Sequence, residues 1–370
     1  MNEDDIILRA EQSRAEQSRA EQSRAEQSRA EQSRADNIDI LKAICAFLIV
    51  CIHIPFPGTI GAYFTALTRI AVPIFFMITG YFYKDTIAAG KEKRQIRKIL
   101  RLFLISNLVY LVWNCTLYAI RIREGVIGYL SDIFSLKSLL KFMLLNDSPF
   151  SGHLWYLGAI LYVLVIIYCL DKIHCRKCLY WIAPFLLAVD LILGKYSMVL
   201  FHREFPYILV RNFLFVGLPY FCIGCVLRDN FDKIKKHSKM MPIGVVIFSI
   251  TTLLERFILE NLQLNTTRDH YISTTFLAIA VFGLMLSRDT SAHSHCEKML
   301  AEVGRRYSTW IYILHPFFIK VIEFVVEKIG MERVFRYVAP FVIYFVTLLF
   351  LAGLSKYVGW PAPKKNKLKR

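Results

Sequence analysis

The chain has 370 residues, of which 55% are hydrophobic, 14% aromatic and only 20% charged. Soluble domains carry about 25% charged residues. Here the apolar residues form long recurring runs, which excludes a soluble enzyme, a disordered protein and a secreted disulfide scaffold. The net charge of +17 is spread over the short segments between those runs, as membrane topology requires, so we expect no nucleic-acid partner. The sequence predicts an all-α polytopic membrane protein.

The first 35 residues form a low-complexity tail that contains five tandem copies of Ala-Glu-Gln-Ser-Arg. A five-residue period matches neither a helix face nor a strand face, so no continuous apolar stripe results. Most of these residues are good helix formers. Glu11 and Arg14 are three residues apart, a spacing that allows an ion pair on a helix, and each copy repeats it. A solvated marginal helix and disorder both stay open. The tail lacks the apolar core of a signal peptide, and we assign it no chemistry.

A bilayer-spanning helix needs about 20 apolar residues, and ten segments meet or approach that length. They are residues 38–55, 61–83, 99–120, 154–170, 179–194, 212–227, 242–259, 272–287, 306–326 and 336–356. We therefore expect about ten transmembrane helices in one membrane domain, residues 36–358, followed by a basic tail, residues 359–370. The stretch Leu136–Leu145 is too short to cross and is expected to be an interfacial amphipathic helix.

Basic residues cluster in loops that fall on one side of a ten-span bundle. They are Lys91, Lys93, Arg94, Arg97, Lys98 and Arg101 before the third span, Arg228, Lys233, Lys235, Lys236 and Lys239 after the sixth, and Lys364, Lys365, Lys367, Lys369 and Arg370 at the end. Residues 260–271, on the opposite side, contain only Arg268 as a cation. The positive-inside rule then places both termini in the cytoplasm of a multi-pass protein of the cytoplasmic membrane. The loop with Lys328, Arg333 and Arg336 fits this orientation less well.

The nine cysteines lie mostly inside apolar runs, where free cysteine behaves as a small hydrophobic residue. Two pairs, Cys175 with Cys178 and Cys222 with Cys225, have a metal-like spacing. No second pair lies at the distance that a zinc finger requires. We therefore expect neither a metal site nor a disulfide framework.

Two ionisable residues within predicted spans are functional candidates, because a charge in the bilayer is costly. His53 follows Lys42 by eleven residues, about 16 Å along a helix. An interfacial histidine at a helix end, before Pro55, is the structural alternative for His53. Arg69 lies too deep to reach the interface easily, so it requires either a structural anion or a ligand.

Further charged residues fall at the span ends and suggest two more features. Asp190, Arg203, Arg211, Glu255, Arg256 and His315 lie in or beside the outward halves of other spans and suggest a polar cavity that opens outward. Arg94, Arg97 and Arg101 share one face of a helix at the inner end of the third span. That face is either a topology signal or a clamp for a phosphate-bearing cytosolic anion.

Several stretches resemble, in order, the motifs of the acyltransferase family 3 membrane enzymes. They are Asn37–Lys42 with the run that ends in His53, the run from Ala71 to Tyr81, the basic cluster before the third span, His153–Leu157, Arg211–Phe213 leading to Gly224, and Tyr312–Pro316. The resemblance covers roughly residues 36–358. Within the family, the chain most resembles the membrane domain of the vancomycin-resistance serine racemases and its free-standing relatives. Since the chain ends soon after the tenth predicted span, we expect the racemase domain to be absent.

The resemblance implies a membrane O-acetyltransferase that moves an acyl group, usually acetyl, from acyl-CoA to a hydroxyl of an envelope acceptor. His53 matches the family's essential histidine, and imidazole is a suitable general base near neutral pH. Arg69 is the candidate for stabilising the oxyanion, and Arg94, Arg97 and Arg101 are candidates for holding the phosphates of coenzyme A. Acyl-CoA would be a co-substrate, and no permanently bound cofactor is expected.

The remaining motif residues are expected to line the site. They are Lys42, His153, Trp155 and Arg211. Many family members have arginine in place of Lys42, and lysine offers a point charge rather than a bidentate fork. An ion pair of Lys42 with Asp39 would survive that change. His315 is expected to be structural, because Pro316 frees a carbonyl that a neighbouring side chain can satisfy.

Transport is the main rival function, either uptake of a small amino acid such as serine or export of a glycan. Transporters often contain internal repeats, and the two halves of this chain show no such symmetry, which favours the enzyme. A receptor or scaffold would not require histidine and arginine inside the membrane. A polysaccharide, peptidoglycan, teichoic acid, a lipid head group and free serine are all possible acceptors, and both acetyl and succinyl donors are compatible with the sequence.

Overall fold

The computed structural model describes residues 21, 32–121, 125–288 and 293–357, and within these ranges it contains helices and no strands. A helix runs through residues 32–53. The other α-helices are α2 (Gly58–Thr68), α3 (Ala71–Ala88), α4 (Glu92–Arg121), α5 (Gly125–Ile133), α6 (Leu136–Leu145), α7 (Trp155–Lys172), α8 (Cys178–Leu193), α9 (Ser197–Phe201), α10 (Leu218–Asp229), α11 (Phe231–Lys236), α12 (Met240–Asn261), α13 (Ile272–Ser287), α14 (His295–Arg306), α15 (Ser308–Ile329) and α16 (Glu332–Tyr357). Three short turns, η1 (Gly152–Leu154), η2 (Tyr207–Leu209) and the π-helical η3 (Phe213–Gly217), complete the set.

Six helical segments are long and apolar enough to cross a membrane. They are Gly58–Ala88, Glu92–Ile120, Gly152–Lys172, Met240–Asn261, Ser308–Ile329 and Glu332–Tyr357. Helices α8 and α13 are apolar but have only 16 residues each. The all-helical class is confirmed, whereas ten crossings and the direction of the termini stay predictions. Nearly all of the repeat tail, and the whole basic tail 359–370, lie outside the described residues.

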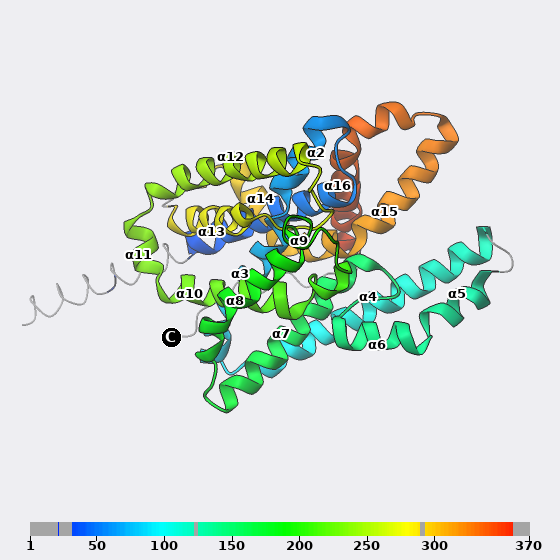
Figure 1. The fold of residues 1–370 in the computed structure, drawn as a ribbon. Helices are drawn as coiled ribbons and strands as arrows, with labels where there is room; N and C mark the ends of the chain where they lie inside the picture. Colours follow the sequence, from blue (N-terminus) through cyan, green and yellow to red (C-terminus); the bar gives the residue numbers. More distant parts are fainter. Residues whose placement is uncertain (1–20, 22–31, 122–124, 289–292, 358–370) are drawn as a thin grey trace, which may run out of the picture.

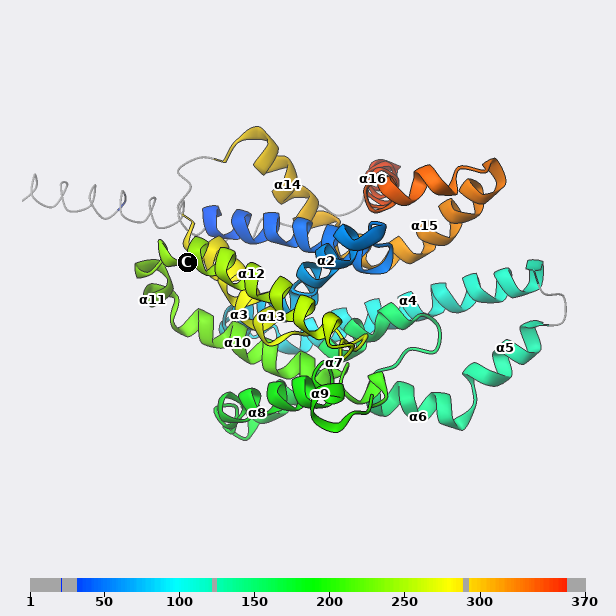
Figure 2. The same cartoon turned by 45° about the horizontal axis from the view of Figure 1, so that its top comes forward.

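Most of the long helices lie roughly along one axis of the molecule, whereas much of α16 runs across them (Figures 1 and 2). We call the end with α11 and the start of α4 the basic end, because the cation-rich segments 91–101 and 228–239 lie there. We call the opposite end, towards which the second half of α4 and the turn between α15 and α16 project in both views, the site end. The second predicted span, 61–83, is divided into α2 and α3 at Arg69 and Ile70. This break leaves Arg69 at a helix end rather than within a helix.

The tight packing of α3 against α10 forms the centre of the main core. A Cβ atom added to Gly80 would lie 2.0 Å from the carbonyl oxygen of Phe221, and one added to Gly224 would lie 2.1 Å from that of Met77. Small residues that allow such close backbone approach are typical of helix pairs in membranes. At the basic end, Arg228 and Asp85 join the same two helices by an ion pair of 2.7 Å. These contacts fix α3, and with it the position of Arg69.

The helix 32–53 packs between α15 and α16 through a second, smaller apolar cluster that includes Ala46, Ile311 and Ile343. At the basic end, Arg305 of α14 holds this helix by ion pairs of 2.9 Å to both Asp36 and Asp39. Two prolines follow the last turn, and proline at these positions prevents the helix from continuing. His53 is therefore presented at the helix end by a firmly packed element.

Candidate active site

Three histidine rings from distant parts of the chain meet at one place. His53 lies in the last turn of the helix 32–53, His153 lies in η1 immediately before α7, and His315 lies within α15. The ring centroid of His53 is 4.9 Å from that of His315 and 6.2 Å from that of His153. The centroids of His153 and His315 are 5.6 Å apart. The structure thus brings two predicted site residues together with a histidine that the sequence assigned to structure.

Both ring nitrogens of His153 are occupied. Its Nε2 lies 3.1 Å from the carbonyl oxygen of Ile313, and its Nδ1 lies 2.7 Å from the hydroxyl of Ser151. Because a carbonyl oxygen can only accept, Nε2 carries the proton and Nδ1 accepts from Ser151. Tyr312 also donates its hydroxyl to the His153 carbonyl. His153 is therefore held as a neutral, buried imidazole with no nitrogen left for a substrate.

His315 is fully buried, and its Nδ1 donates to the carbonyl oxygen of Ile311 at 3.0 Å. Its Nε2 has no hydrogen-bond partner among the described residues. Pro316, the residue that follows, cannot donate to the Tyr312 carbonyl one turn earlier. The adjacent Ile313 carbonyl accepts from His153 and from the Tyr110 hydroxyl, the latter at 2.7 Å. The expectation that a side chain satisfies the carbonyl freed by this proline stays a prediction.

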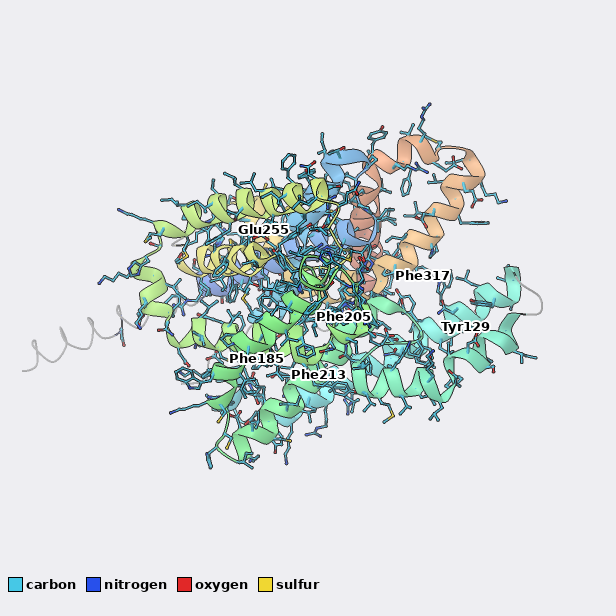
Figure 3. The ribbon with its side chains drawn as sticks, in the orientation of Figure 1. Tyr129, Phe185, Phe205, Phe213, Glu255 and Phe317 are labelled. Carbon is cyan, nitrogen blue, oxygen red and sulfur yellow. The ribbon has the colours of Figure 1, made fainter. Side chains whose placement is uncertain are left out.

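His53 differs from the other two histidines in its accessibility. Its side chain is exposed, and neither of its ring nitrogens is hydrogen bonded within the part of the chain that the structure describes. Two residues beyond His315, the Phe317 ring lies 4.4 Å from that of Trp113 on α4. Figure 3 shows Phe317 on the side of α15 that faces α4. Of the three imidazoles, His53 is the one that a substrate can reach.

Arg69 forms an ion pair with Asp269, which lies in the segment between α12 and α13. The hydroxyl of Tyr207 in η2 donates to the other carboxylate oxygen of Asp269. Burial alone would raise the pKa of Asp269, but Arg69 and Arg211 outweigh that effect and hold its pKa below the usual range. The structural alternative for Arg69, an internal anion, is therefore what the structure contains.

Arg211 lies next to the histidine cluster without a carboxylate partner among the described residues. Its guanidinium carbon is 5.1 Å from the Trp155 ring centroid and 4.7 Å from that of Tyr207. It donates to the carbonyl oxygen of Gly152 at 3.1 Å, directly beside His153. Stacking on two aromatic faces leaves most of its donors available.

A further buried hydrogen-bond network adjoins Asp269. Asp190 of α8 lies 2.9 Å from Nδ1 of His270, and both side chains are buried. Lys195 donates to the Thr266 carbonyl at 2.7 Å and to the Asn265 side chain at 3.2 Å. Burial lowers the pKa of Lys195 to about 7, and the nearby Arg69 acts in the same direction. The loops before α9 and α13 are thereby fixed around Asp269.

Two of the residues expected to line an outward polar cavity share one small pocket. Asp190 and Arg211 line a space of about 10 Å³, enough for about one water molecule. Glu255 instead accepts from Tyr196 at 2.9 Å, and Arg256 pairs with Glu260 at 3.2 Å. A larger cavity, of about 310 Å³, opens beside the end of the helix 32–53. Its lining consists of Ile54, Pro55, Glu323, Val326, Glu327, Glu332, Phe335, Arg336 and Ala339.

The predicted phosphate clamp lies apart from the histidine cluster. Arg94, Arg97 and Arg101 are exposed on α4 towards the basic end. The same helix continues to Tyr110, whose ring centroid is 5.0 Å from that of His153. Nine residues of helix, about 14 Å, separate Arg101 from Tyr110. Lys42 forms the expected ion pair with Asp39, at 2.9 Å, at the basic end of its helix.

Sequence reasoning missed Asp269, Tyr207 and the free nitrogen of His315. Asp269 could have been found, because Arg69 requires an anion and residues 268–270 place an aspartate between two basic side chains directly before an apolar helix. Tyr207 gave no such signal, since tyrosine is frequent in this chain. Cysteine, histidine and carboxylate groups form no metal-binding cluster of three or more within the described ranges.

Comparison with known proteins identifies the fold's family. The profile of an acyltransferase domain matches residues 36–356. A serine/alanine racemase of Enterococcus gallinarum is 25% identical over 316 residues, which cover 80% of this chain and 42% of the relative. An amino-acid racemase of Enterococcus faecalis is 22% identical over 307 residues, which cover 78% of this chain and 41% of the relative. The chain thus spans about two fifths of the length of these curated relatives. No solved structure matches the chain.

Proposed function

The chain belongs to the family of membrane proteins with this acyltransferase domain, and from that premise we propose that it transfers an acyl group, acetyl in the simplest case, from acyl-CoA to a hydroxyl group of a cell-envelope acceptor. The observation that carries the proposal is the accessible His53 held against two buried histidines. An imidazole with a free nitrogen is the general base that attack of a hydroxyl on a thioester requires.

The donor is proposed to bind at the basic end. Arg94, Arg97 and Arg101 share one exposed face of α4 and can form charge-assisted hydrogen bonds with the phosphates of coenzyme A. The positive-inside rule assigns this end to the cytoplasm, where acyl-CoA is available. The pantetheine arm would follow α4 towards Tyr110 and the histidine cluster. The thioester would then reach about half-way through the hydrocarbon core, which is about 30 Å thick, without a covalent enzyme intermediate.

The acceptor is proposed to enter through the cavity of about 310 Å³ beside Ile54 and Pro55, directly after His53. His53 takes the proton of the acceptor hydroxyl as its oxygen attacks the thioester carbonyl carbon. The tetrahedral intermediate then collapses, the carbon–sulfur bond breaks, and His53 returns the proton to the leaving thiolate. The products are an ester on the acceptor and free coenzyme A.

For the negative charge of the tetrahedral intermediate, we favour Arg211 over Arg69. Arg69 is already neutralised by Asp269, whereas Arg211 lies beside Gly152 and His153 with donors available. Arg69 then contributes indirectly, because Asp269 orients Tyr207, on which Arg211 stacks. Trp155 completes the other face of that stack.

The decisive experiment measures release of free coenzyme A from acetyl-CoA by the protein in vesicles supplied with crude envelope glycan. We expect acceptor-dependent release by the wild type, at least about a hundredfold less by His53→Ala, and wild-type release by His237→Ala, which replaces an exposed histidine at the basic end. Release that is equal in His53→Ala and wild type would overturn the mechanism. Uptake of radiolabelled serine without any release would favour the transporter.

A further inference from the structure

A buried polar atom without a partner lies in the histidine cluster. His315 is 0% exposed, and its Nδ1 is engaged with the Ile311 carbonyl at 3.0 Å. Since that carbonyl can only accept, Nδ1 carries the proton and Nε2 of the neutral ring carries a lone pair. This Nε2 has no hydrogen-bond partner among the described residues. Buried polar atoms are rarely left in this state, and each one requires an explanation.

The groups that face His315 leave one donor for this lone pair. The N–H of His153 is used by Ile313, and its other nitrogen accepts from Ser151. The hydroxyl of Tyr312, whose ring is 6.4 Å away, is used by the His153 carbonyl. The His53 ring, at 4.9 Å, has hydrogen bonds to neither nitrogen within the described residues. A small rotation of the His53 side chain would bring its N–H within hydrogen-bonding reach of His315.

We propose that His315 is a positioning residue whose Nε2 accepts the N–H of His53 and so fixes the tautomer and orientation of the base. The inference rests on the proposed function and extends it. With one nitrogen of His53 bonded to His315, the other presents its lone pair to the acceptor hydroxyl. The arrangement follows the general scheme in which a base is oriented by a third group.

A neutral imidazole suits this position better than the carboxylate that often orients a catalytic histidine. An ionised carboxylate at this depth would be costly, and it would pair with Arg211, whose donors the proposed mechanism keeps for the tetrahedral intermediate. His315 accepts a hydrogen bond without adding a charge. When His53 gains a proton during the reaction, the same bond is strengthened because its donor is then ionised.

Two substitutions separate this role from simple packing. In His315→Asn, the side-chain amide can keep the bond to Ile311 but has no atom at the place of Nε2. In His315→Gln, the longer side chain carries an acceptor to that place. His293→Asn is the matched control, because His293 is also a buried histidine and lies at the basic end, bonded to Asn37 at 2.9 Å.

The first readout needs no acyl transfer. Diethylpyrocarbonate modifies accessible neutral imidazoles, and peptide mass spectrometry measures its rate at His53 in vesicles. We expect His315→Asn to slow modification of His53 about tenfold, His315→Gln to restore at least a third of the wild-type rate, and His293→Asn to have no effect. The exposed His237 provides the internal reference in every sample.

The second readout is turnover with acetyl-CoA over a range of pH. We expect His315→Asn to lower kcat at least about tenfold with the KM for acetyl-CoA unchanged, and to shift the pH profile of kcat, because a tautomer is lost rather than a binding contact. A kcat of His315→Asn equal to that of the wild type, or equal losses of kcat in His315→Asn and His315→Gln, would overturn the proposal. Modification that depends on His315 in a protein without turnover would support the positioning role and contradict the acyltransferase.

Discussion

The two ends of the bundle hold their charges in opposite ways. At the site end, Arg69 and Asp269 are largely buried, and Tyr207 completes the bonding of the carboxylate. At the basic end, Arg94, Arg97 and Arg101 are exposed and have no carboxylate partner within the described residues. A buried charge must be neutralised within the protein, whereas an exposed cation stays available to a ligand. Charges at the site end therefore fix the geometry of the site, while the exposed cations at the basic end are free to bind a ligand.

The largest effect is expected from removing the buried anion. Asp269→Asn leaves Arg69 without its countercharge, and breaking such a pair costs about 3 kcal/mol, near the lower end of the usual range because the Arg69 side chain is 23% exposed. Thermal unfolding of the purified protein in detergent would measure the loss.

The matched control for Asp269→Asn is Asp229→Asn. Asp229 pairs with Lys84 at 3.1 Å, but their side chains are 47% and 66% exposed. An exposed pair contributes less than about 1 kcal/mol. Equal losses in the two variants would refute the contrast between the two ends.

The next largest effect is expected at the basic end and concerns binding rather than stability. Replacing Arg94, Arg97 and Arg101 together by glutamine should raise the KM for acetyl-CoA at least about tenfold, because their charge-assisted bonds to phosphate are lost. The kcat should stay near that of the wild type, since these residues lie far from His53. Steady-state assays at low and high salt would check both points, because salt should weaken only the wild-type interaction.

The control for the arginine variant replaces Lys91, Lys93 and Lys98 by glutamine. This change removes the same charge from the same end of the molecule. If it raises KM by the same factor, the arginine face is a topology signal and not a phosphate clamp.

Sequence reasoning succeeded where a local pattern determines the outcome. The apolar runs predicted the helices, and the prolines after His53 predicted a helix end there. The depth of Arg69 required an anion, but Asp269 is 200 residues away along the chain, and no local pattern encodes that contact. The break between α2 and α3 was also missed, although Pro73 in the first turn of α3 cannot donate to the carbonyl of Arg69 and is typical of a helix start.

The role of His315 shows the same limit at a single side chain. The following proline indicated only that α15 lacks one backbone donor at this place. The sequence could not show that Ser151 and Ile313 would occupy both nitrogens of His153, or that the ring of His315 would lie 4.9 Å from that of His53. Such contacts depend on how η1, α15 and the helix 32–53 pack together. They are tertiary properties that propensity and periodicity do not contain.

The last effect is a dependence of stability on pH, expected from Lys195, a buried cation at the site end that has no carboxylate partner among the described residues. Burial lowers its pKa to about 7 from an ordinary value of 10.5. Between pH 7 and 10.5 the unfolded chain therefore binds more protons than the folded protein, and stability from this group rises with pH across that window. Below pH 7 both states are protonated and the contribution is constant. We expect the Tm in detergent to rise by a few degrees from pH 7 to pH 9.5, and Lys195→Met to remove this rise of Tm with pH.

The control is Lys98→Met, which removes an exposed cation at the basic end and should leave the slope of Tm against pH intact. A slope that persists in Lys195→Met would mean that Lys195 is charged in the folded protein, and the buried network would then have to contain a countercharge for it.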